Sequence, residues 1–203
     1  MKELELKIKL IDFILKEFND VLISSEFRFD FGSRRADVIS LKDDIAIVFE
    51  IKSAKDSVER LQYQMQSYVN YFDFCYVVCV NENITAVRKH ISKSIGIILI
   101  SGNSVRIIRK AYQFRKQNKL SLCSTIPTSD LKKLTRDKKI RSKYELCLSV
   151  SVCNPLDKIK KLSRIKLKEK IIDNFSIFNS ELGKVITPDD ILTLTRVSSG
   201  EIL

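Results

Sequence analysis

The sequence has little of several features that particular protein classes require. It contains one histidine, His90, so the multi-histidine sites of HNH-type and HD-type hydrolases cannot be assembled. Its five glycines form no Gly-rich phosphate-binding loop. No run of about 18 apolar residues occurs, which argues against a membrane-spanning helix. What is present is a 203-residue chain with 44% hydrophobic and 30% charged residues, a composition typical of a globular protein.

The five cysteines show no spacing that would predict a zinc site. Cys75 and Cys79 fall in one expected strand, roughly 13 Å apart at about 3.3 Å per residue, too far to share an ion. The other three have no ligand spacing either. Residues 1–5 alternate charge with leucine, unlike the apolar segment of a signal peptide. We therefore expect free thiols, no membrane association and a cytoplasmic location.

The net charge of +11 is unevenly distributed along the chain. Residues 1–110 hold 17 Lys and Arg against 15 Asp and Glu, a net of +2, whereas residues 111–203 hold 19 against 10, a net of +9. A basic segment suits a phosphate backbone, which attracts cations without regard to base sequence. An ordinary lysine-rich surface explains the charge equally well.

The hydrophobic periodicity predicts an α/β fold whose core is a mixed β-sheet flanked by helices. The expected elements are a helix over 3–18, strands over 27–31, 36–41 and 45–52, a helix from Asp56, a strand over 74–80, a helix over 84–92 and a hairpin over 95–100 and 104–109.

From about Tyr112 the pattern becomes mainly helical. Helices are expected after Pro127, after Asn154-Pro155 with the asparagine as N-cap, and at Thr187-Pro188. The sequence thus predicts a core over 1–112 and a basic, mostly α-helical region over 113–203.

The strand over 45–52 carries the most informative residues. Alternation places Glu50 and Lys52 on one face with Ala46 and Val48. Burying a carboxylate and an ammonium beside apolar residues is costly, and such a pair seldom stabilises a fold relative to apolar residues. Their presence therefore indicates chemistry.

Asp37 supplies a second carboxylate for the same site. It begins the strand that a short polar turn places antiparallel to residues 45–52, so the start of one strand meets the end of the other. Mg²⁺ is commonly held by one or two carboxylates together with substrate phosphate, and Mn²⁺ can replace it. We expect Asp37 and Glu50 to bind the metal and Lys52 to orient or deprotonate the attacking water.

An aspartate, a hairpin and Glu-x-Lys, followed in the next helix by Gln64 and Tyr68, resemble the PD-(D/E)XK nuclease superfamily, with its restriction-endonuclease-like fold. The Gln-x-x-x-Tyr spacing is similar to RecB-like members, and nearby residues resemble a small, poorly characterised bacterial family within the superfamily. Ala36 stands where the superfamily's name has proline, a position that does not touch the metal.

The resemblance also implies supporting residues with individual roles. Glu26 is placed as an additional metal ligand, with Glu5 and Glu17 as weaker rivals. Gln64, Tyr68, Arg60 and Arg35 would support the site. Apart from the resemblance, charge predicts phosphate contacts by Arg34, with an ordinary charged loop as the alternative. It also predicts them for three lysines on one side of the helix after Pro155: Lys158, Lys161 and Lys168.

The expected function is a Mg²⁺-dependent nuclease that hydrolyses DNA phosphodiester bonds in a repair, defence or mobile-element setting. One alternative is a non-catalytic DNA-binding or protein-binding module on the same fold, since fold does not fix function. Another is an RNA-directed nuclease, because no residue identified here reads a 2′-hydroxyl. Expected partners are nucleic acid, with a second copy of the chain or an accessory protein as further alternatives.

Overall fold

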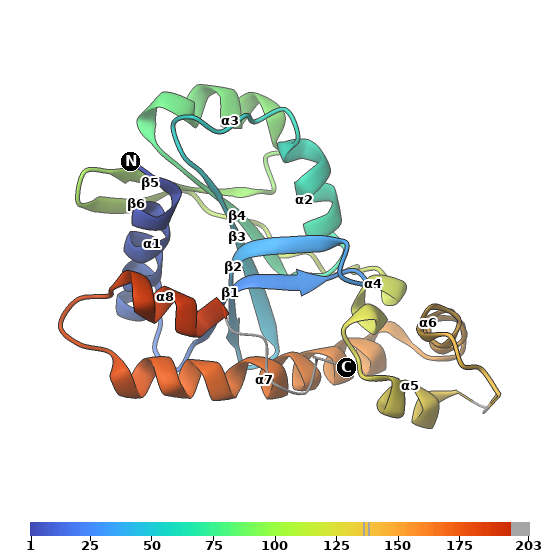
Figure 1. Cartoon of the computed structure of the whole chain (residues 1–203). Helices are drawn as coiled ribbons and strands as arrows, with labels where there is room; N and C mark the ends of the chain where they lie inside the picture. Colours follow the sequence, from blue (N-terminus) through green and yellow to red (C-terminus); the bar gives the residue numbers. More distant parts are fainter. Residues whose placement is uncertain (136, 138, 196–203) are drawn as a thin grey trace.

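The computed structural model describes residues 1–135, 137 and 139–195, and in these a six-stranded sheet is covered by helices on both faces (Figure 1). The strands lie in the sheet in chain order. The first three are antiparallel, the next two run parallel to the third, and the last closes the sheet antiparallel. They are β1 (Leu22–Phe29), β2 (Arg34–Lys42), β3 (Ile45–Lys52), β4 (Phe74–Cys79), β5 (Gly96–Ser101) and β6 (Ser104–Arg109).

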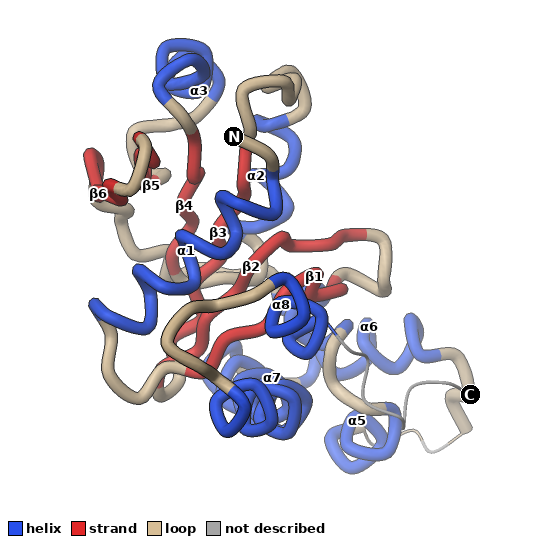
Figure 2. The backbone as a smooth tube through the Cα atoms, turned by 60° about the vertical axis from the view of Figure 1, so that its left-hand side comes forward, coloured by secondary structure: helices blue, strands red, loops and turns tan. Residues whose placement is uncertain are grey.

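One face of the sheet is covered by the two terminal helices. Helix α1 (Glu3–Glu17) buries a stripe of four apolar residues at helical spacing, Leu6, Leu10, Ile11 and Ile14. Helix α8 (Pro188–Thr195) joins the same apolar cluster, as does Phe178 near the end of α7 (Leu156–Glu181). Figure 2 shows α1 and α8 on the same side of the strands.

The opposite face carries the remaining larger helices. Helix α2 (Leu61–Val69) packs there together with a helical layer of α4 (Lys119–Ser124), α5 (Thr128–Leu134), α6 (Lys143–Cys153) and most of α7. A short 3₁₀ turn (Asn81–Asn83) and α3 (Ile84–His90) connect β4 to β5. No helix among the described residues combines the length and apolar character needed to cross a membrane.

The helical region and the sheet share one apolar core. Side chains of α4, α6 and α7 belong to the same buried cluster as those of the strands and α2. A buried ion pair joins them as well: Arg164 of α7 donates through Nη2 to Asp73 Oδ2 at 3.0 Å and to the Tyr71 carbonyl at 2.5 Å. Asp73 is fully buried directly before β4, so α7 is fastened to the centre of the sheet.

The mixed sheet, the flanking helices and the helical C-terminal region confirm the coarse fold predicted from sequence. Three local predictions are wrong. The first strand was expected over 27–31, but β1 runs from Leu22 to Phe29. It ends at Phe29 because Asp30 and Phe31 adopt left-handed backbone. Helix α2 starts at Leu61, since Asp56 instead accepts the Ser53 N–H at 2.6 Å in a turn.

The third wrong prediction concerns the start of α7. Asn154 does not cap this helix; its side-chain amide donates to the carbonyls of Val150 at 3.0 Å and Leu134 at 3.3 Å, which closes the end of α6. The cap at Thr187 is confirmed, because its hydroxyl accepts the Asp190 N–H and Asp190 accepts the Thr187 N–H.

Candidate functional site

A buried charged network occupies the end of β3. Glu50 is 2% exposed and Lys52 is 9% exposed, and Lys52 Nζ lies 2.9 Å from Glu50 Oε1. Both side chains lie on the face that α2 covers, as the alternation of the strand predicts. Two charges withdrawn from water in this way need further polar partners to persist.

Helix α2 supplies those partners through two residues one turn apart. Gln64 donates from Nε2 to Glu50 Oε1 at 2.6 Å and accepts from Lys52 Nζ at 3.1 Å, so one amide fixes both charged groups. The Tyr68 hydroxyl lies 2.5 Å from Glu50 Oε2 and 3.1 Å from the Arg35 carbonyl. Tyr68 is 1% exposed, and its burial together with the Glu50 charge raises the pKa of its phenol. This network holds the Glu50 carboxylate in one orientation.

Asp37 lies where β2 and β3 stop pairing. The ladder between the two strands ends at Val38 and Phe49, one residue before Asp37 would face Glu50. Beyond that point the Asp37 carboxylate takes the place of a backbone acceptor, because Oδ2 accepts the Ile51 N–H at 2.7 Å. The strands therefore separate at Asp37, and its carboxylate enters the space between them.

Glu26 occupies a strained position on the neighbouring strand. Its φ of +55° is left-handed, and it interrupts the β1–β2 ladder between Ser25 and Phe27. Such backbone costs roughly 1–3 kcal/mol for a residue other than glycine and collects at functional sites. The carboxylate pairs with the buried Lys7 of α1, and its Oε2 lies 2.7 Å from Arg35 Nε without an aligned hydrogen bond. Glu26 is therefore paired with two cations, Lys7 and Arg35.

Three carboxylates from different elements converge at this point. Oxygen atoms of Glu3, Glu26 and Asp37 all lie within 4.8 Å of one another, while the Glu50 carboxylate faces α2 next to this group. The sequence did not single out Glu3; Glu5 and Glu17 were the expected contributors from α1. Glu3 joins the group because of the way α1 packs on the sheet. With its apolar stripe against the sheet, α1 places Glu3 and Lys7 next to Glu26.

Burial, together with the charge of Glu50, raises the pKa of Asp37 to about 7, against the opposing effects of the Ile51 hydrogen bond and the charge of Lys7. A raised folded-state pKa stabilises the protein fully below the unfolded value of 3.8, and this stability is lost as pH rises through about 7.

Replacing this carboxylate with an amide is therefore expected to stabilise the protein at alkaline pH. Asp37→Asn should raise the free energy of unfolding relative to wild type, by about 2 kcal/mol more at pH 8 than at pH 5. Urea unfolding in EDTA at both pH values measures this. Asp44→Asn, at an exposed turn, is the control and should show no such difference. Equal destabilisation by Asp37→Asn at both pH values would contradict the assignment.

Arginines surround the opening of the site. Arg34 stacks on Tyr63, with its guanidinium carbon 4.3 Å from the ring centroid, and donates to the Tyr63 hydroxyl. Arg35 is exposed and contacts Glu26, and Arg60 is exposed at the residue before α2. The α7 lysines named from the sequence, Lys158, Lys161 and Lys168, are all exposed. Their nucleic-acid contacts stay predictions.

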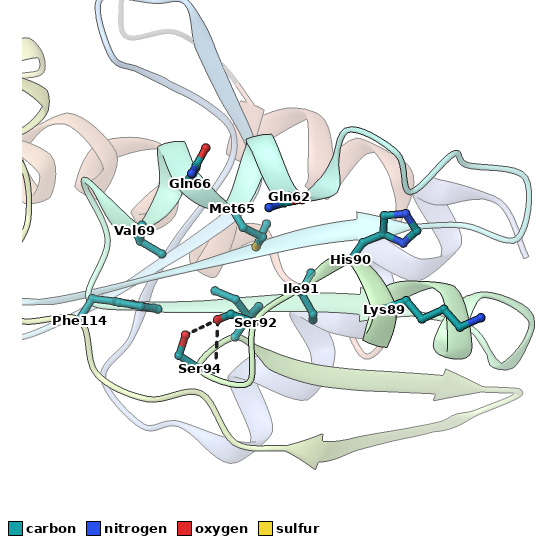
Figure 3. A pocket seen from close by; sticks show the side chains of 11 residues that line it. Gln62, Met65, Gln66, Val69, Lys89, His90, Ile91, Ser92, Ser94 and Phe114 are labelled. Atoms are coloured by element: carbon teal, nitrogen blue, oxygen red, sulfur yellow. Dashed lines mark hydrogen bonds between the residues drawn. The ribbon is translucent and has the colours of Figure 1, made fainter.

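A larger cavity lies elsewhere, between α2 and the residues that follow α3. Its volume is about 480 Å³, and Figure 3 shows Met65, Val69, Ile91 and Phe114 around it. His90 stands at its edge with Nδ1 2.8 Å from the Ala86 carbonyl. No carboxylate is among its lining residues within the described part of the chain. Its lining includes one imidazole, His90, but it does not present the carboxylates that usually hold magnesium.

Comparison with known proteins places the whole described architecture in one family. The model of the family described as Bacteriophage P4 protein cII matches residues 1–195. The chain belongs to this family. Protein cII of Enterobacteria phage P4 is 29% identical over 208 residues, which cover 97% of this chain and 78% of the phage protein.

A solved structure is also similar to this cII-family chain, the SPO1766 protein of unknown function from Silicibacter pomeroyi. The two share 16% identity with a TM-score of 0.46, over 61% of this chain and 84% of the other. This distant likeness has no bearing on the site. The cII family match spans the sheet, the acidic site and the helical region together.

Proposed function

We propose that this cII-family protein is a divalent-cation-dependent nuclease that hydrolyses DNA phosphodiester bonds, in a phage or mobile-element setting. The observation that carries the proposal is the meeting of Asp37, Glu26 and the Glu50–Lys52 pair at one end of the sheet. The strand order, three antiparallel strands and then a parallel one, supports the resemblance to the restriction-endonuclease-like core.

The carboxylates fit a magnesium or manganese ion. Asp37, Glu26 and Glu3, whose oxygen atoms lie within 4.8 Å of one another, would hold it. Glu50, expected from the sequence as a ligand, lies outside this group, and its two oxygens accept from Lys52, Gln64 and Tyr68. Carboxylates are hard oxygen ligands, and Glu26 already carries two cationic partners, Lys7 and Arg35. When bound, such an ion would polarise the phosphate and lower the pKa of a water molecule.

The protein's own groups then perform the remaining work. Lys52, held by Gln64, presents an ammonium that orients the attacking water and stabilises charge on the phosphate oxygens. The water oxygen releases a proton to solvent and forms a new bond to phosphorus, the bond to one sugar oxygen breaks, and that oxygen takes up a proton from solvent. Tyr68 keeps the Glu50 carboxylate in place, and Arg34 and Arg35 at the opening favour a negatively charged backbone.

A second candidate function is a binding module on the same fold. The Glu50, Lys52, Gln64 and Tyr68 side chains satisfy one another without any ion, so the network is also compatible with a purely structural role. In that case the basic surface would bind nucleic acid or a partner protein and leave it intact.

A cleavage panel distinguishes the two functions. Supercoiled, linear, single-stranded and branched DNA, together with single-stranded RNA, are incubated with wild-type protein in Mg²⁺, Mn²⁺ or EDTA. We expect metal-dependent cleavage of at least one DNA substrate and a loss of about a thousandfold in Glu50→Ala. Glu59→Ala, at an exposed position outside the network, is the matched control.

Intact substrates under every condition, with nucleic-acid binding retained, would favour the binding module. Cleavage of RNA alone would move the activity to the RNA-directed alternative. Cleavage that persists in EDTA or in Glu50→Ala would contradict the proposed site.

A further inference from the structure

A second polar cleft lies where the β1–β2 turn meets the helical region. Its volume is about 330 Å³, and its walls come from the hairpin, from α4, from the start of α6 and from α7. Figure 2 shows the hairpin turn extending from the sheet toward α6. Segments far apart in the sequence therefore build this cleft.

The cleft collects positive charge from three separate elements. Arg28 of β1, Lys143 at the first residue of α6 and Lys170 of α7 all line it, together with two hydroxyl-bearing residues of the α4 end, Ser124 and Thr125. None of its lining residues within the described part of the chain is acidic. Arginine and lysine side chains suit phosphate oxygens, whereas the Ser124 and Thr125 hydroxyls already donate to the carbonyls of Ser121 and Leu122.

Contacts within the hairpin and with β1 position two of the groups at the cleft. In the turn, the Asp30 carbonyl accepts the Ser33 hydroxyl at 2.7 Å. Lys170 also lies over the Phe27 ring, with Nζ 5.3 Å from the centroid, which fixes this ammonium beside the strand.

An exposed aromatic pair stands beside the cations. Phe31 of the turn and Tyr144 of α6 have ring centroids 5.4 Å apart, and they are 39% and 50% exposed. Phe31 also has a φ of +57°, in the left-handed region that costs roughly 1–2 kcal/mol for a residue with a side chain. A strained backbone that keeps a large apolar ring in solvent indicates that the ring has a binding role.

We propose that this cleft binds single-stranded nucleic acid, with Arg28, Lys143 and Lys170 on the phosphates and bases stacked on Phe31 and Tyr144. Sequence-independent binding of single strands usually combines two features. Cations lie along the phosphate backbone, and aromatic rings stack on bases of any kind. The exposed aromatic pair beside three cations distinguishes this cleft from a site for a peptide, which offers neither a repeating phosphate charge nor stacked bases.

The cleft and the acidic site are close enough to contact the same nucleic-acid strand. Arg28 lies two residues after Glu26 on β1 and is paired with Arg35 of β2, so about 7 Å of strand separates the two positions along β1. That a bound strand continues from this cleft to the carboxylates rests on the proposed function. The binding itself does not, because it needs neither metal nor hydrolysis.

Fluorescence anisotropy tests the cleft without any cleavage. Wild type and variants are titrated in EDTA with a labelled single-stranded DNA of about 20 nucleotides, long enough to cover a typical binding site. The Phe31→Ala/Tyr144→Ala double variant should lose about tenfold or more in affinity. Arg28→Gln/Lys143→Gln should bind more weakly and reduce the slope of log affinity against log salt by about 1.4, since each contact contributes about 0.7.

The control is Tyr112→Ala/Lys184→Gln, which removes a 68% exposed tyrosine and an exposed lysine outside the cleft and should bind like wild type. Far-ultraviolet circular dichroism shows that each variant is folded. Single-stranded RNA and a DNA duplex of the same sequence are measured in parallel. If the affinity for single-stranded RNA falls in the same way in the cleft variants, the proposal is supported and the ligand includes both DNA and RNA.

The proposal is overturned if wild type does not bind single strands, or if both cleft variants bind them like the control. The proposal is also overturned if the duplex binds more tightly than the single strand and the aromatic substitutions leave the duplex affinity unchanged. Failure of the nuclease proposal looks different: DNA would stay uncleaved in Mg²⁺ while binding in EDTA still depended on the cleft.

Discussion

Lys52→Met is expected to reduce metal-dependent DNA cleavage by about a thousandfold, the scale of losing a positioned group that acts on the attacking water and the charged phosphate. Lys52 Nζ contacts oxygen atoms of Glu50 and Gln64 in the described hydrogen bonds, and under the proposed function these contacts would hold the ammonium toward the phosphate. Methionine keeps the length and apolar stem of the side chain and removes the charge.

Single-turnover cleavage at saturating protein measures this effect, with DNA binding in EDTA measured in parallel. Binding should stay within about twofold of wild type, because one cation among many contributes little to backbone affinity. Lys55→Met, at an exposed lysine three residues later, is the matched control and should cleave normally. Wild-type rates in Lys52→Met would remove Lys52 from the chemistry.

Arg164→Met is expected to destabilise the protein by about 3–5 kcal/mol, because it leaves the buried Asp73 carboxylate without its main partner. Asp73 is fully buried, and the Arg164 side chain is 0% exposed, with Nη2 3.0 Å from Oδ2. Lys160, Gln117 and the Ala46 N–H also donate to this carboxylate, so Asp73 connects the sheet, the loop before α4 and α7.

Lys133→Met is the comparison for this effect, because Lys133 pairs with Asp130 at a similar 2.8 Å but is 75% exposed. Its loss should cost at most about 1 kcal/mol. Urea unfolding of the two variants measures both values. Similar small effects for Arg164→Met and Lys133→Met would show that α7 is not fastened to the sheet through Asp73.

The sequence predicted the features that depend on local pattern. The strand Ile45–Lys52 has the predicted limits, and Glu50 and Lys52 share the expected face. Gln64 and Tyr68 reach Glu50 because residues four apart lie on one side of a helix. Tyr68 is fully buried, which the spacing alone does not specify.

Features that depend on how distant elements meet could not be predicted. Glu3 reaches the acidic group because α1 crosses the sheet at an angle that the hydrophobic stripe does not specify. The left-handed backbone at Glu26 leaves no mark in an alternating strand sequence. The contact between Phe31 and Tyr144 joins residues 113 positions apart, and two charged residues, Asp73 and Arg164, give no sign in isolation that they form a buried pair.

The central claim is that the carboxylates at the end of the sheet form a divalent-cation site, and direct metal binding tests it. Mn²⁺ is titrated into wild-type protein at pH 8 and followed by electron paramagnetic resonance, which separates free from bound ion. We predict saturable binding by wild type, with Asp37→Asn and a Glu26→Gln/Glu50→Gln variant weakened by at least about tenfold, as losing a charged oxygen ligand requires. Folded wild-type protein that binds no Mn²⁺, or binds it equally well after these substitutions, would contradict the account.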